Sequence, residues 1–139
     1  MKTIKLKLVI ESQKLILTGR VTYQDNLIIA TDQSIQGLEE KLKQLLFEFE
    51  ELAPDTIEFE PVYDVYSLFQ QFDFLKISKV AQHTGINPGL LRQYTSQVKY
   101  PSITQTKKIE KAIHKLAEQM MQVSLHVARG WPHAKIFSI

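Results

Sequence analysis

Residues 80–96, VAQHTGINPGLLRQYTS, combine side chains that form a sharp corner between two short helices. Gly85 can take the left-handed conformation that ends a helix without a Cβ clash. Asn87 is a good helix cap, and Pro88 fits the first turn of the helix that follows. With Ile86 filling the corner, this spacing predicts a helix-turn-helix.

The second helix of this pair, expected over residues 88–96, should turn Leu91 and Tyr94 inward and leave a short polar face outward. That face suits a DNA major groove, where arginine reads guanine and glutamine reads adenine. Phosphate donors are expected on the following loop and helix. The residues expected to bind DNA are Asn87, Gly89, Arg92, Gln93, Ser96, Lys99, Tyr100, Lys107 and Lys108. The alternative is an ordinary corner between packed helices beside a solvated lysine-rich face.

Charge is unevenly divided along the 139 residues. The formal net charge is +2, but residues 1–65 carry 7 Lys/Arg against 12 Asp/Glu, a net of −5, and residues 66–139 carry 10 against 3, a net of +7. This split favours nucleic acid as a partner of the second half, and a basic partner or improved solubility for the first. The simpler interpretation is that the two surfaces differ without any partner.

The first half of the chain has the apolar pattern of a sheet with one helix. Alternation predicts the first strands, and the apolar run at residues 27–31 predicts a more deeply buried one. A helix should follow, capped by Asp32 or Ser34, with a buried stripe that includes Phe49. Pro61 indicates a strand end or a sheet edge. The expected strands are residues 4–10, 15–21, 27–31 and 56–62.

From Asp64 onward the apolar period is helical. Four helices are expected, the first capped by Asp64 and the last with Pro101 in its first turn and an apolar stripe that reaches Met120. The predicted architecture is α+β: a βββαβ domain over residues 1–63, then an all-α helix-turn-helix domain over residues 64–124.

The remaining residues, 125–139, form a tail without a clear period. Trp131 and Phe137 either pack loosely or cover the domain, or they anchor a dimer or partner contact.

Several classes of protein are disfavoured by what the sequence lacks. It has no cysteine, which excludes disulfides and thiolate metal sites and suggests a cytoplasmic protein. No apolar stretch approaches the ~18 residues of a membrane span, and the start does not resemble a signal peptide. The histidines lack metal-ligand spacing and the carboxylates do not cluster, so no enzyme activity, metal or cofactor is expected. The histidines are His83, His114, His126 and His133.

The segment KISKVAQHTGINPGLLRQYTSQVKYPSITQTKKIEKAIHKLAEQM, residues 76–120, resembles the C-terminal helix-turn-helix of HicB-like antitoxins, especially the bacteroidete type. The preceding TIEFEPVYDVYSLFQQF, residues 56–72, is similar to the strand and helix that lead into it. The family joins a partial ribonuclease-H-like βββαβ domain to a DNA-binding domain, and the resemblance covers most of residues 1–124. It places the tight turn at Gly85 and Ile86.

The chain also departs from the family pattern. Gln97 stands where glycine is common, and the N-terminal half lacks the Gly-rich, Pro-containing middle of the family domain. Residues 125–139 have no recognised counterpart.

The resemblance implies a dimeric antitoxin that sequesters a small HicA-like messenger-RNA-cleaving toxin and represses its own operon. Two reading helices about 34 Å apart would face a pseudo-palindromic site. The sheet edge and the C-terminal tail are the candidate dimer surfaces. The acidic first half suits a basic toxin. The alternative is a free-standing transcriptional regulator whose first domain serves only dimerisation or sensing.

Overall fold

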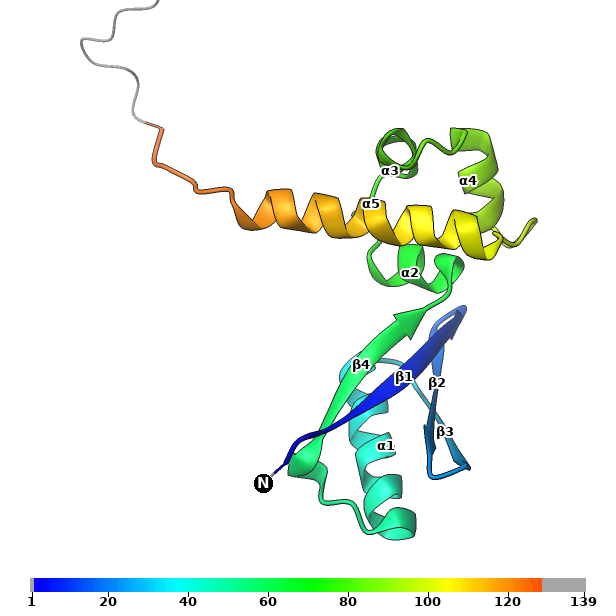
Figure 1. Ribbon diagram of the computed structural model, residues 1–139, viewed down its shortest axis with the longest axis vertical. Coiled ribbons are helices and arrows are strands. Elements are labelled where there is room, and N and C mark those ends of the chain that lie inside the picture. Colours follow the sequence, from blue (N-terminus) through cyan, green and yellow to red (C-terminus); the bar gives the residue numbers. More distant parts are fainter. Residues whose placement is uncertain (1, 129–139) are drawn as a thin grey trace, which may run out of the picture.

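The protein has an α+β fold in which a four-stranded mixed sheet precedes a group of helices (Figure 1). Its structure, a computed structural model, describes residues 2–128. The elements are β1 (Ile4–Gln13), β2 (Ile16–Tyr23), β3 (Asn26–Asp32), α1 (Ile35–Glu50), a 3₁₀ turn (Pro54–Thr56), β4 (Ile57–Tyr63), α2 (Val65–Gln71), α3 (Ile77–Thr84), α4 (Pro88–Thr95) and α5 (Ile103–Met121). The predicted βββαβ order and the later change to helices are confirmed.

The sheet has the strand order β3-β2-β1-β4, in which β1 runs parallel to β4 and antiparallel to β2. Strand residues point alternately to opposite faces, so Leu8 and Ile10 of β1 share the face that α1 covers. Leu38 of α1 lies so close that a Cβ on Gly19 of β2 would be 2.7 Å from its Cδ2 atom. We call residues 4–63 the sheet unit.

Two expectations about the sheet unit are wrong. β3 is an edge strand in which Leu27 and Ile29 are more than half exposed, so it is not more deeply buried than β1 and β2. Phe49 lies on the apolar stripe of α1 but is 71 % exposed. Its helical turn lies level with the start of β3, where Asn26 donates a hydrogen bond to Glu50. Because β3 is the edge of the sheet, Phe49 faces an open surface hollow there and not the closed core.

The helices α2 to α5, residues 65–121, form the helical unit around a second core. Asp64 caps α2 by accepting a hydrogen bond from the Ser67 N–H, as predicted. Pro101, in contrast, lies outside α5, because Ser102 is the cap and the helix begins at Ile103. Met120 is 64 % exposed, because the last turns of α5 extend past α3 (Figure 1). The predicted burial of Met120 is therefore wrong.

A buried hydrogen bond connects the two units. Ile10 and Tyr63 are the last residue pair of β1 and β4. Ser12 lies two residues further along β1, so its N–H points to the same side of the strand as the N–H of Ile10. It donates a hydrogen bond to the Ser67 Oγ of α2 at 2.8 Å. Ser67 is completely buried, so its hydroxyl takes the place that a continued β4 would have filled.

Within residues 2–128, no helix is long and apolar enough to cross a membrane. Trp131 and Phe137, for which the sequence suggested packing or partner contacts, lie outside the described residues.

Candidate nucleic-acid interface

The corner between α3 and α4 is fixed by three consecutive residues. Gly85 has a φ of 75°, the left-handed conformation expected for it, and its N–H donates to the Ala81 carbonyl. Ile86 is 5 % exposed and fills the corner. Thr84 donates through its Oγ1 to the Ala81 carbonyl at 2.8 Å and accepts from the Ile86 N–H at 2.9 Å.

Thr84 and Gly85 end α3 as expected, but the two hydrogen bonds of the Thr84 hydroxyl were not predicted. A threonine at the end of a helix followed by glycine was the available signal, because a hydroxyl there can bond the backbone on both sides. Since Thr84 is itself buried, both hydrogen bonds are shielded from water. The angle between α3 and α4 is therefore held by shielded hydrogen bonds as well as by the buried Ile86.

The start of α4 has the predicted cap. The Asn87 Oδ1 accepts a hydrogen bond from the Gly89 N–H at 2.8 Å, and Pro88 occupies the first helical position. Both Asn87 and Gly89 are exposed. Because Gly89 has no side chain, the backbone of this turn is open to close approach by a ligand.

The rest of α4 has one buried and one exposed face. Leu91 is completely buried and Tyr94 is 7 % exposed, as expected. Arg92 and Ser96 are exposed, and Gln93 is half-buried. The buried face fixes the helix in the core, so Arg92 projects from a rigid support.

The loop after α4 folds back onto its last turn. The Gln93 carbonyl accepts hydrogen bonds from the N–H groups of Val98 and Lys99 at 3.0 and 3.2 Å. Gln97 has a φ of 64°, a left-handed conformation that glycine adopts with less strain. The glycine-like geometry is thus present without glycine, and it places Lys99 and Tyr100 in an exposed loop beside α4.

The lysines of α5 lie on its outward face, away from the buried Ile109. Lys107 is 3.7 Å from the Glu110 carboxylate, an exposed pair that contributes little to stability. Among residues 2–128, Lys108, Lys111 and Lys115 form no ion pair.

The structure groups most of the predicted site residues but not all of them. Those from Asn87 to Ser96 line one short helix, and Lys99 and Tyr100 adjoin its C-terminal end. Lys107 and Lys108 belong to a helix that packs mainly against α3 rather than α4. Lys107 and Lys108 lie in the first turns of α5, which Figure 1 draws close to α4, so they belong to a neighbouring element and not to α4 itself.

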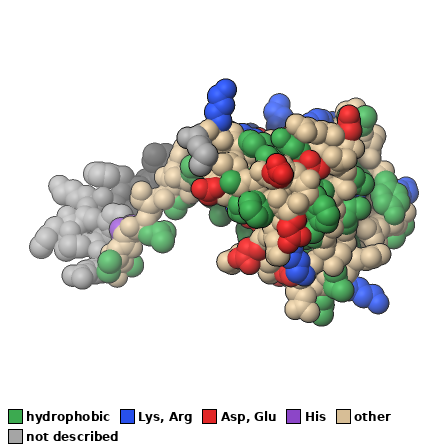
Figure 2. Space-filling model, turned by 90° about the horizontal axis from the view of Figure 1, so that it is seen from below, with side chains coloured by type: hydrophobic (Ala, Val, Ile, Leu, Met, Phe, Trp, Pro, Cys, Tyr) green, Lys and Arg blue, Asp and Glu red, His purple; other side chains and the backbone are tan. Residues whose placement is uncertain are grey.

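The sheet unit, at the opposite end of the molecule, differs in the charge of its surface. Figure 2 views the sheet unit from below and shows acidic side chains among apolar ones over the middle of that face, with basic side chains at its margins. Lys41 of α1 is paired with Asp32 at 3.0 Å. The Ser34 backbone N–H, followed by Lys41, lowers the pKa of Asp32.

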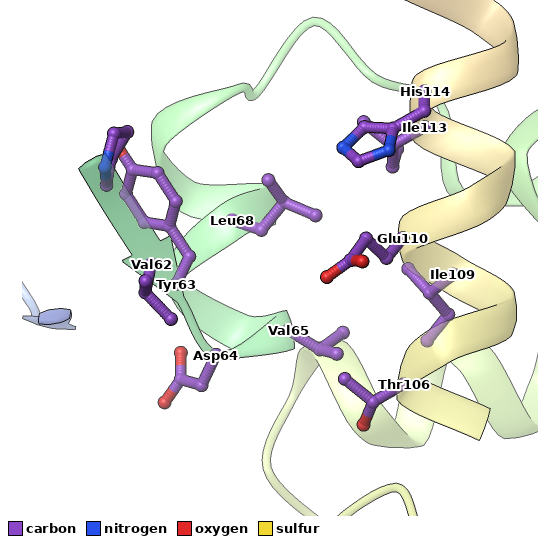
Figure 3. Close-up of a pocket in the computed structure, with 11 residues that line it drawn as sticks. Val62, Tyr63, Asp64, Val65, Leu68, Thr106, Ile109, Glu110, Ile113 and His114 are labelled. Carbon is purple, nitrogen blue, oxygen red and sulfur yellow. The ribbon is translucent and has the colours of Figure 1, made fainter. Parts of the chain in front are cut away.

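A pocket of about 200 Å³ lies where β4, α2 and α5 meet (Figure 3). Glu110 and His114 reach it from α5, and Tyr63 reaches it from the end of β4. Burial, and then the charge of Glu39, raises the pKa of Tyr63. The pocket is smaller than the roughly 300–1,000 Å³ of typical ligand sites. No group of three metal-ligating side chains occurs in the described part of the chain.

Comparison with protein-family models, with curated proteins and with solved structures gave no match for this chain.

Proposed function

We propose that this protein is a DNA-binding antitoxin of the HicB-like kind. It reads a pseudo-palindromic operator through α4, represses its own operon and neutralises a small, basic HicA-like toxin that cleaves messenger RNA. The observation that carries the DNA-binding part is the corner at Thr84, Gly85 and Ile86. It holds α4 rigidly with its polar face in solvent.

Two roles are separated on this surface. Arg92 is the reading residue, because it is exposed at the middle of α4 and has the planar donor group that pairs with guanine. Lys99, Lys107 and Lys108 hold the DNA backbone, because they flank α4 and phosphate contacts do not depend on base identity.

The antitoxin part is supported by where the acidic excess lies. On the open face of the sheet, acids are balanced by neighbouring bases, as in the pair of Arg20 with Glu11 and the cross-strand neighbours Lys7 and Glu60. Around α1 the acids are mostly unbalanced. They are Glu39, Glu40, Glu48, Glu50, Glu51 and Asp55. A basic, RNA-binding toxin therefore finds its complementary surface on the α1 side.

The DNA-binding part is tested by separating reading from holding. After selection of a preferred duplex from a random pool, affinity is measured for that duplex and a scrambled one at several salt concentrations. Arg92→Ala should cost about 1–3 kcal/mol on the preferred duplex and relax preference at one base pair per half-site. Lys108→Ala should weaken binding to both duplexes alike and lower the salt slope by about one unit.

Lys5→Ala, at an exposed position of β1, is the matched control and should change neither quantity. If Arg92→Ala leaves the ratio of preferred to scrambled affinity unchanged, Arg92 is not the reading residue. If binding shows no salt dependence, the chain does not bind DNA through this surface.

The second candidate is a free-standing transcriptional regulator, favoured by the same α4 geometry without a toxin. Co-expression with the neighbouring reading frame distinguishes the two. A small basic protein that stops growth alone, and is neutralised by this chain but not by a chain with its α1 acids replaced, supports the antitoxin. Absence of any toxic neighbour supports the regulator.

A further inference from the structure

An apolar groove of about 310 Å³ lies between the end of α2, the α2–α3 loop and the second half of α5. Its lining contains no charged or polar side chain. Phe72 and Phe74 form one wall and contact each other edge to face, with ring centres 6.1 Å apart. The lining residues are Leu68, Phe72, Phe74, Leu75, Ile113, Leu116, Ala117 and Met120.

The chain that leaves α5 adds a second apolar feature. Val123, Leu125 and Val127 alternate with Ser124 and His126, the period of a strand with one apolar face. These three apolar residues are 65, 93 and 73 % exposed, and none of the described residues covers them. Figure 1 shows this segment leaving the end of α5 away from the body of the molecule.

The segment is symmetrical in its apolar pattern. When two copies run antiparallel with Leu125 opposite Leu125, Val123 of each lies opposite Val127 of the other. Directly opposed residues of an antiparallel pair point to the same face, so all the apolar side chains of both copies gather on one side. Such a two-stranded ribbon is marginal by itself and needs an apolar surface beneath it.

We propose that a second copy of this chain docks here. Residues 123–127 of the two copies pair antiparallel about Leu125, and their common apolar face covers the two grooves. A two-fold interface must be complementary to itself, and an uncharged apolar surface meets this condition where a surface of one charge sign does not.

The position of the surface fits the proposed reading of DNA. No residue of α4 lines the groove, so docking leaves both reading helices exposed. This use of the dimer rests on the proposed function, whereas the association itself is measurable without DNA.

The size of the surface sets the expected strength. The eight lining residues, with Met121, Val123, Leu125 and Val127, make twelve. A standard stable interface has roughly 20–30 residues on each side. Self-association is therefore expected in the micromolar range, with the chain monomeric at nanomolar concentration.

Sedimentation equilibrium of the full chain tests the proposal. Wild type should show a monomer–dimer equilibrium at micromolar concentration. Met120→Glu and Leu125→Glu should each raise the dissociation constant by more than roughly tenfold, because each would bury an unpaired charge. Ile103→Glu is the matched control. Ile103 is 83 % exposed at the other end of α5, and its replacement should leave the equilibrium unchanged. Circular dichroism checks that all variants remain folded.

Cross-linking tests the predicted symmetry. Because the chain has no cysteine, Leu125→Cys supplies a single thiol near the two-fold axis, and an added two-electron oxidant should convert the two facing thiols to an intermolecular disulfide. Ile103→Cys should not form this dimer.

A wild type that is only monomeric at micromolar concentration, or equal cross-linking of both variants, overturns the proposal. So does a dimer that persists in both glutamate variants. A monomer that still binds DNA refutes this interface alone, and a dimer that does not bind DNA refutes the proposed function alone.

Discussion

The two hydrophobic cores of this molecule differ in how completely they are closed. In the sheet unit, Leu8, Ile10, Leu38 and Leu42 are fully buried between α1 and the sheet. In the helical unit, Ser67, Val80, Leu91 and Ile109 are buried as completely, but the core opens into solvent toward Phe74 and the end of α5. In the sheet unit, the buried residues of α1 thus pack against the sheet of the same chain. The helical unit leaves part of its apolar surface exposed, where we propose that a second copy docks.

The largest expected effect tests whether the sheet unit is closed. Leu42→Ala removes a fully buried side chain between α1 and the sheet and should lower the free energy of unfolding by about 2–5 kcal/mol. Urea denaturation measures the change. Phe49→Ala, on the same stripe but 71 % exposed, should change stability by less than about 0.5 kcal/mol. Similar losses for both variants would show that burial does not distinguish the two positions.

These two residues also show how far the sequence predicts the fold. Leu42 and Phe49 lie on the same apolar stripe of α1, so the spacing gives the face of the helix but not where the edge of the sheet beneath it lies. The burial of β3 likewise depends on the order of the strands, which the apolar spacing does not give. Its apolar run predicts a strand, and only its position at the edge exposes Leu27 and Ile29.

At the candidate site, local chemistry made prediction easier. Gly85 and Asn87 have the backbone geometry expected of them, because a helix end and a helix cap depend on neighbouring residues only. The positive φ of Gln97 could not be predicted from its residue type, since it follows from the hydrogen bonds that the loop makes to Gln93. Contact with DNA by the site residues stays a prediction.

A smaller effect tests whether the two units behave as one. Ser67→Ala leaves the buried Ser12 N–H without an acceptor and should cost about 1–3 kcal/mol. Because that hydrogen bond joins the units, fluorescence and circular dichroism should give urea transitions further apart in the variant than in wild type. Ser124→Ala, at an exposed position, should alter neither. Coincident transitions with unchanged midpoints would mean that the hydrogen bond contributes nothing to the junction.

The smallest effect concerns the entry into α1. The Ser34 backbone N–H and then Lys41 lower the pKa of Asp32, so its stabilisation is present above the unfolded pKa, near 3.8, and is lost as the pH falls through the lower folded value. Asp32→Asn should therefore be less stable than wild type at neutral pH, and this difference should shrink on acidification below pH 4. Thermal melts across that range measure it. Asp73→Asn, which removes no hydrogen bond or ion pair within residues 2–128, is the control, and an equal response in both variants would contradict the role of Asp32.

The parallel pairing of β1 with β4 has a consequence for synthesis on the ribosome. Ile4 pairs with Ile57, so the first strand to emerge has to wait for the last strand of the sheet. Until then Leu8 and Ile10 lack part of their cover, and this long-range closure is slow compared with forming contacts between neighbouring helices. The sheet can close only after residue 63 has left the exit tunnel. The order of translation therefore allows the sheet to be complete before the helix that carries Arg92 has emerged.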